Sequence, residues 1–222
     1  MSVEHALSCK TGGLVHIRHD DVADEWRHLC GTALSPCRVE REPRIFSSVS
    51  RRVRTADGAS APDSSTPTAD APRPPAATEE RGDASCHGFW ERGRTTIFDM
   101  RITDTDARSY WKKEFAKVLE QHEKEKKDKY LQICLEMRKD FTPMVYSVDG
   151  IAGREAWNAE KRLATHLAGK WNREYSHQMV YYVRVRMAIA VVRANSLLIR
   201  GSRDRQRPRR PLIPGGAVLG AS

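Results

Sequence analysis

Two aspartates stand where the sequence predicts the two strands of a hairpin, within residues 82–102. In the second strand Asp99 and Arg101 alternate with apolar residues, and successive strand side chains point to opposite faces, so both are expected on one face. The same alternation gives Asp83 a defined face of the first strand. Pairing the strands would bring Asp83 and Asp99 together. Two close carboxylates repel, so they either raise one pKa or hold a divalent cation.

A cation held by these two aspartates has a clear chemical use. Carboxylate oxygens are hard ligands that suit magnesium, and manganese accepts the same ligands. Such an ion polarises a phosphodiester and generates hydroxide from bound water, while the neighbouring Arg101 stabilises phosphate charge. The spacing also fits two exposed acids with a surface ion pair between Asp99 and Arg101. Both interpretations stay open on spacing alone.

Composition favours an intracellular protein with a polyanionic partner. The 222 residues carry a net charge of +9, and no apolar run is long enough to span a membrane. Nucleic acid is therefore expected as the partner, DNA before RNA, and no membrane. The five cysteines are an odd number without a CxxC pair, and we find no signal peptide. A reducing compartment, nuclear or cytoplasmic, is therefore expected.

Composition also divides the chain. Residues 47–80 are rich in Ser, Pro and Ala and are expected to form a disordered insertion. Residues 201–222 are expected to form a basic disordered tail. Residues 1–46 then hold the first helix and first strand of a single domain, and residues 81–200 hold the remainder with the C-terminal helices.

Hydrophobic periodicity predicts the order of the elements. The sequence indicates a helix, a strand, the hairpin, a second helix, a strand and two helices, at residues 19–34, 37–42, 82–102, 107–137, 141–148, 154–171 and 178–199. A strand, a crossover helix and a further strand imply parallel pairing, here between the Asp99 strand and residues 141–148. The expected fold is α/β with one mixed sheet.

This α-β-β-β-α-β order resembles the core of the PD-(D/E)XK nuclease superfamily, which has the restriction-endonuclease-like fold. Asp83 and the Asp99-x-Arg101 pair stand where that family keeps an aspartate and an acid-x-lysine pair. Arg101 departs from the pattern, because an arginine stays protonated and does not act as a base.

A closer resemblance covers roughly residues 5–46 and 81–203. The strings HGFWERG, IFDMRITD, HEKEKKDKY and FTPMVYSVDGIAG resemble uncharacterised eukaryotic proteins found downstream of reverse transcriptases in retroelement polyproteins. The resemblance implies that the arginine is a family trait, that the insertion is foreign to the family, and that a reverse transcriptase of the same element is a partner.

Further acids and cations are candidates for the site. His122 and Lys126 continue the apolar stripe of the helix over residues 107–137, so both are expected to point toward the sheet. Lys126 would then hold the attacking water or the phosphate, although a lysine on the helix rim is the alternative. Glu123 lies beside this stripe as a supporting acid. The nuclease resemblance implies an acid on the first helix, with Asp21, Asp24 and Glu25 as candidates, unless they only favour the helix dipole.

Two more features concern binding. His5 and Cys9 resemble half of a zinc knuckle, with His16 and His19 nearby, but no cysteine pair precedes them, so zinc is not expected. Arg186, Arg193 and Arg200 recur every seven residues along the last helix, and Arg203 extends the charge. They are candidates for phosphate contacts, or form a solvated basic face.

Two functions from different classes follow. The first is a magnesium-dependent (or manganese-dependent) DNA endonuclease of retroelement origin, with Asp83 and Asp99 as metal ligands and with Arg101 and Lys126 stabilising phosphate charge. The second is a catalytically inactive nucleic-acid-binding or assembly domain derived from a mobile element.

Overall fold

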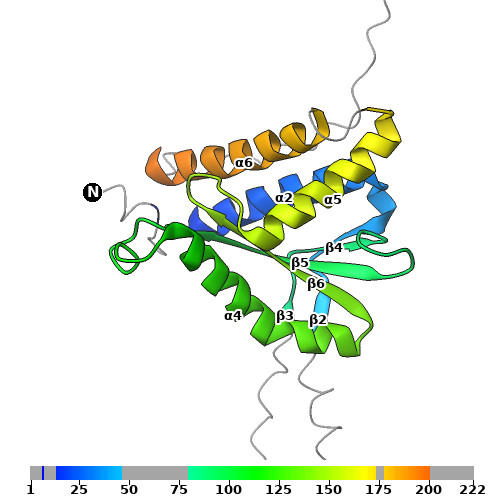
Figure 1. Ribbon diagram of the computed structural model, residues 1–222, viewed down its shortest axis with the longest axis horizontal. Helices are drawn as coiled ribbons and strands as arrows, with labels where there is room; N and C mark the ends of the chain where they lie inside the picture. Colours follow the sequence, from blue (N-terminus) through cyan, green and yellow to red (C-terminus); the bar gives the residue numbers. More distant parts are fainter. Residues whose placement is uncertain (1–6, 8–13, 47–79, 174–177, 201–222) are drawn as a thin grey trace, which may run out of the picture.

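A mixed four-stranded sheet lies between helices on its two faces (Figure 1). The computed structural model describes residue 7 and residues 14–46, 80–173 and 178–200. The sheet has the order β1-β4-β5-β6, formed by Val39–Arg41, Ala84–His87, Thr95–Thr103 and Lys139–Ser147. Strands β1, β4 and β5 are antiparallel neighbours, whereas β5 and β6 are parallel. Among the described residues the fold is thus α/β with a mixed sheet, as expected.

Helices cover the sheet unequally. Helices α2, α5 and α6 (Leu14–Ala33, Arg154–Trp171 and Val180–Arg200) lie on one face, and α4 (Phe115–Glu136) crosses the other face between β5 and β6 (Figure 1). Successive side chains of β5 point alternately to the two faces of the sheet. Phe98 and Met100 join the main core with Trp26 of α2, whereas Ile97 packs with Tyr130 and Cys134 of α4. Asp99 therefore belongs to the α4 face.

The connection between β4 and β5 is turned by glycines. Gly88 and Gly93 have φ angles of 79° and 83°, a backbone conformation that favours glycine. Phe89 follows the turn at Gly88 and is fully buried in the main core. Its ring packs edge-on against Phe98 at 4.9 Å. Arg162 of α5 fixes the turn by donating to the carbonyls of Phe89 and Trp90.

Several element boundaries differ from the expected ones. Helix α4 begins at Phe115 rather than near residue 107, since Asp104 accepts the backbone N–H of Asp106 and so favours turns over helix there. Trp111 is consequently 72% exposed. Two short strands were not predicted, β2 (Arg44–Phe46) and β3 (Glu80–Arg81), which pair antiparallel. Residue 80, expected in the insertion, thus belongs to a strand, and residues 47–79 and 201–222 lie outside the described residues.

Candidate active site

Asp99 lies in the middle of β5 and faces a lysine from α4. Its side chain is buried, and the Lys126 Nζ atom lies 2.5 Å from its Oδ2 atom. The Lys126 ammonium also lies 6.0 Å from the ring centroid of Tyr130, one turn further along α4. The helix periodicity that predicted an inward Lys126 is thus consistent with this contact. Because α4 is the crossover between β5 and β6, the fold itself brings these two residues together.

Asp83 joins this pair from the neighbouring strand. It directly precedes β4, and its backbone N–H donates to the Phe98 carbonyl. Its Oδ2 atom accepts the Met100 backbone N–H at 2.5 Å and lies 3.1 Å from Nε2 of His19. Burial raises the pKa of Asp99, the Lys126 ammonium opposes this shift, and the negative charge of Asp83 adds to it. The two carboxylates therefore interact electrostatically.

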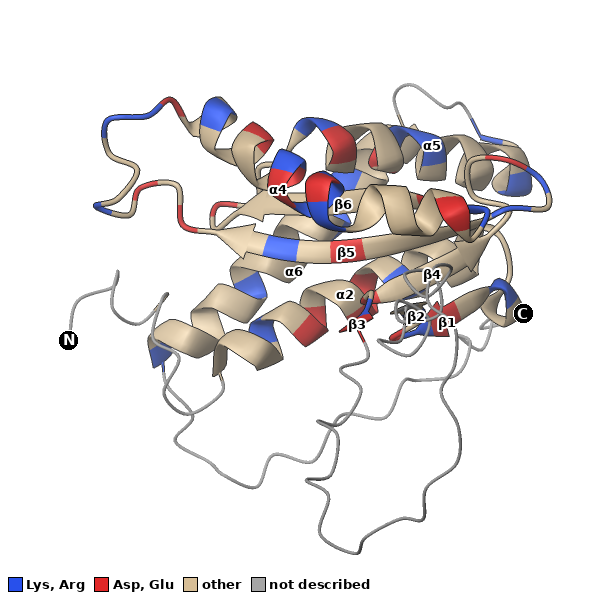
Figure 2. Cartoon of the chain, turned by 90° about the horizontal axis from the view of Figure 1, so that it is seen from below, with Lys and Arg blue, Asp and Glu red and all other residues tan. Residues whose placement is uncertain are grey.

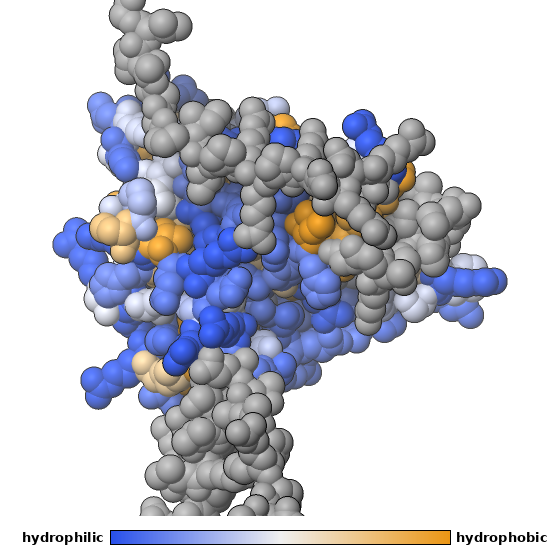
Figure 3. All heavy atoms as spheres, turned by 180° about the vertical axis from the view of Figure 1, so that it is seen from behind, coloured by the Kyte–Doolittle hydropathy of each residue, from blue (hydrophilic) through white to orange (hydrophobic). Residues whose placement is uncertain are grey.

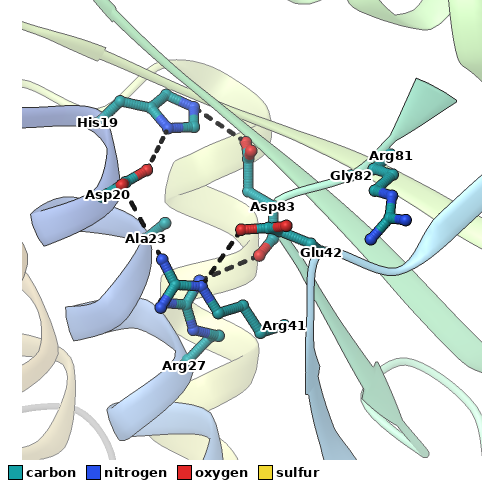
Figure 4. A pocket seen from close by; sticks show the side chains of 9 residues that line it. All are labelled: His19, Asp20, Ala23, Arg27, Arg41, Glu42, Arg81, Gly82 and Asp83. Carbon is teal, nitrogen blue, oxygen red and sulfur yellow. Dashed lines mark hydrogen bonds and ion pairs between the residues drawn. The ribbon is translucent and has the colours of Figure 1, made fainter. Parts of the chain in front are cut away.

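A cavity of about 180 Å³ opens beside Asp83 (Figure 4). Its lining combines acids with cations, namely His19, Asp20, Ala23, Arg27, Arg41, Glu42, Arg81, Gly82 and Asp83. Arg27 donates to the Asp83 carbonyl at 3.1 Å. The hydrogen bond to Asp83 raises the pKa of His19, and burial opposes the shift. An imidazole and three guanidinium groups lie there beside the carboxylates of Asp20, Glu42 and Asp83, and guanidinium groups can bind the oxygens of a phosphodiester.

The first helix contributes residues other than the expected acids. Asp21 and Asp24 are exposed, and Asp24 forms an ion pair with Arg27. His19 and Asp20 line the cavity instead. The helix begins at Leu14, earlier than expected, so residues 19 and 20 lie well inside it. A sequence signal existed, because His19 precedes the buried Val22 by three residues and therefore continues the buried stripe of α2.

Two further candidates, Arg101 and His122, have other partners. Arg101 pairs with Glu125 of α4 at 2.8 Å. His122 is buried as expected, but it hydrogen-bonds Thr103 and Tyr110, and burial lowers its pKa. These contacts account for both positions without a metal.

Glu123 has a structural contact of its own. It accepts the backbone N–H of Glu155 at 2.8 Å, in the first turn of α5. Gly153 is packed against this carboxyl so closely that a side chain there would clash with it. Glu123 thus ties α4 to the start of α5, where a carboxyl group satisfies a free N–H group.

Asp83 and Asp99 are the candidate ligands of a metal ion. Within the described ranges, no group of three or more His, Cys, Asp and Glu side chains is arranged to hold one. Magnesium is often held by only one or two carboxylates, with water and substrate phosphate completing its shell. Asp83 and Asp99 supply two such carboxylates, but Lys126 already pairs with Asp99 Oδ2, and the Met100 N–H and His19 already contact Asp83 Oδ2, so an ion would bind the remaining oxygens or replace these partners. His5 and Cys9 lie outside the described residues.

The basic face of the last helix is smaller than the spacing predicted. Arg186 pairs with Glu25 of α2 at 2.6 Å and donates to the Tyr182 hydroxyl at 2.8 Å, so it serves the contact between α6 and α2. Arg193 and Arg200 are exposed, and blue positions recur along α6 in Figure 2. Arg203 lies outside the described residues. Two arginines thus remain for phosphate contacts on the described part of this face.

Comparison with known proteins gave no match, whether to a family model, to a curated protein or to a solved structure. In the described part of the chain, none of the helices has the length and apolar character needed to cross a membrane.

Proposed function

We propose that this chain is a restriction-endonuclease-like (PD-(D/E)XK) nuclease domain of retroelement origin that cleaves DNA with a divalent metal. One observation carries the proposal. Asp99 of β5 forms an ion pair with Lys126 of α4 near the centre of a mixed sheet, and the negative charge of Asp83, directly before β4, acts on Asp99. The α2-β1-β4-β5-α4-β6 connectivity, with β5 and β6 parallel across the α4 crossover, supports it. Under this proposal the protein is intracellular and works beside a reverse transcriptase.

The residues of the site have separate roles under this proposal. Asp83 and Asp99 would hold magnesium or manganese, which would supply a Lewis acid and a bound water of lowered pKa. Lys126 takes the place of the family's lysine, which Arg101 cannot fill, but it reaches Asp99 from α4 instead of from β5. Its ammonium would hold the phosphate or the attacking water. His19 keeps Asp83 oriented through its hydrogen bond.

The lining of the cavity would bind the substrate. Arg27, Arg41 and Arg81 surround Asp83 and offer guanidinium donors that match the geometry of phosphate oxygens. Because these arginines would contact phosphate oxygens, cleavage would depend on the backbone and shape of the DNA, not on its sequence.

Substitution of Asp99 tests the proposal. We expect Asp99→Asn to reduce magnesium-dependent cleavage of plasmid and single-stranded DNA on the order of 10²-fold or more, because one carboxylate of the pair is lost. Asp128→Asn, an exposed acid of α4, serves as the matched control and should cleave like the wild type. Thermal unfolding of each variant reports on the fold. Wild-type turnover by Asp99→Asn would overturn the assignment of the site.

A non-catalytic nucleic-acid-binding domain is the second candidate. The Lys126 ammonium already neutralises Asp99 without a metal, so the fold does not need the ion. This function predicts that the wild type binds DNA but shows no cleavage with magnesium or manganese, and that Asp99→Asn leaves the DNA affinity unchanged.

A further inference from the structure

A second cavity, of about 260 Å³, lies on the other side of the sheet from Lys126. It is lined by the loop after β6, by α5 and by α6, with the residues Gly150, Ile151, Ala152, Trp157, Glu160, Arg184 and Ala188. Helices α5 and α6 cover the face opposite α4 (Figure 1), whereas Asp99 faces α4. The two sites are therefore separate.

An acid with an unsatisfied oxygen forms part of this cavity. Glu160 is only 2% exposed, and its Oε1 atom accepts the Tyr146 hydroxyl at 2.9 Å. Its Oε2 atom is buried without a hydrogen-bond partner among the described residues, and the nearest cation, Nε of Arg184, lies 3.9 Å away. A buried acceptor left without a donor is costly, so a ligand that brings an N–H group would gain affinity here. Burial raises the pKa of Glu160 to about 7, which agrees with a group that lacks a close cation.

A planar and cationic wall completes the cavity. The Arg184 guanidinium carbon lies 2.9 Å from the centroid of the Trp157 ring, which places a flat charged group against a flat aromatic one. Such surfaces stack on aromatic heterocycles and attract an anion. An organic cation is disfavoured, because Arg184 carries the same charge. The volume is below the range of about 300–1,000 Å³ for drug-sized ligands, so it suits a single ring system.

We propose that this cavity binds one nucleobase that carries an exocyclic amino group, as part of a nucleotide whose phosphate contacts Arg184. The amino group of adenine, cytosine or guanine donates to Oε2 of Glu160, and the ring stacks on the outer face of the Arg184 guanidinium, which itself covers Trp157. Uracil presents carbonyl oxygens beside its N–H group, and these repel a carboxylate. A free nucleotide and an unpaired nucleotide of a strand share this chemistry.

Calorimetric titration with AMP, CMP, GMP and UMP tests the proposal, with EDTA present so that no cleavage interferes. We expect the amino-bearing nucleotides to bind at least tenfold more tightly than UMP. Glu160→Gln should remove this preference, because it places an amide where the free oxygen lies. Arg184→Met should weaken the binding of nucleotides more than the binding of the corresponding nucleosides. Lys117→Gln, an exposed position of α4, is the control and should match the wild type.

The outcomes separate this site from the proposed nuclease. Absence of binding at millimolar nucleotide, equal binding of UMP, or unchanged binding in Glu160→Gln would each overturn the base site, whatever the cleavage assay gives. Competition distinguishes the two sources of the ligand: a single-stranded oligonucleotide displaces the mononucleotide if the site serves a strand, and fails to do so if the site serves a free nucleotide.

Discussion

The Asp99–Lys126 pair has a structural role as well as its proposed chemical one. A buried carboxylate without a partner is costly, and an adjacent ammonium relieves that cost. The pair therefore holds α4 against β5 in the absence of any metal. Removing Lys126 alone would leave Asp99 buried and uncompensated, so Asp99→Asn is the better single test of the site.

Glu160 gives a prediction for stability against pH. Burial raises its pKa from 4.5 to about 7, so the folded chain keeps a proton that the unfolded chain loses at lower pH. The free energy of unfolding therefore falls by on the order of 3 kcal/mol as the pH rises from about 4.5 to about 7. Above pH 7 the contribution of Glu160 to folding is at its least favourable. Denaturant unfolding of the wild type and of Glu160→Gln across this range measures the effect. The variant should show the flatter profile.

The matched control for that experiment is Glu120→Gln, which changes an exposed acid of α4. It should reproduce the wild-type slope, since an exposed carboxyl has nearly the same environment in both states. Parallel profiles for the wild type and Glu160→Gln would show that Glu160 titrates alike in the folded and unfolded chains.

At the residue scale the sequence predicted the direction in which a side chain points better than it predicted the residue that the side chain contacts. Alternation put Asp99 on the face opposite Phe98, and helix spacing turned Lys126 toward the sheet. Partners depend on where elements cross, and spacing along one element carries no such information. His19 was therefore considered only as a neighbour of a zinc half-site, and the contact of Arg101 with Glu125 was not foreseen.

At the scale of elements, long periodic segments were predicted well and short ones poorly. Helix α5 has the expected bounds, because its apolar stripe runs over its whole length. Strands β2 and β3, of three and two residues, are too short to show a period. Their pairing carries information of its own, since it holds together the two ends of the segment 47–79.

This pairing predicts that the segment is replaceable. Arg44 pairs with Arg81 and residue 46 with Glu80, so the chain leaves and returns at neighbouring points. A four-residue Gly/Ser linker in place of residues 47–79 would span that gap as a hairpin loop, at a smaller loop-closure cost. We expect the midpoint of thermal unfolding to change by no more than a few degrees. A fall of ten degrees or more would mean that the segment packs on the domain.

A scrambled segment separates length from sequence. A variant with the 47–79 composition in shuffled order should unfold at the wild-type temperature, because little in that composition gains stability from burial. Destabilisation by shuffling alone would point to specific contacts.

Over the whole molecule, charge is distributed more evenly than the net value of +9 suggests. Acidic and basic positions alternate along α4 in Figure 2, and Figure 3 shows a largely hydrophilic face with separate apolar patches. Several cationic side chains form ion pairs within the protein, as Arg186 does with Glu25. The net charge therefore overestimates the number of cations that are available to contact DNA phosphates. The contribution of each arginine has to be tested by substitution.

The salt dependence of DNA binding tests the α6 face. Arg193 and Arg200 are exposed and separated by seven residues, so both would reach phosphates along one side of α6. Replacing both with glutamine should weaken binding to all duplex sequences about equally and reduce the log–log salt slope by about two. Fluorescence anisotropy across a salt series measures affinity and slope together.

Arg186→Gln is the informative comparison on the same helix. Because Arg186 is held by Glu25 and Tyr182, its replacement should lower thermal stability while leaving the salt slope nearly unchanged. If instead the slope falls with Arg186→Gln and not with the double variant, Arg186 leaves its internal partners to bind DNA. If neither variant changes the slope, α6 is only a solvated surface, and the phosphate contacts belong to Arg27, Arg41 and Arg81 around Asp83.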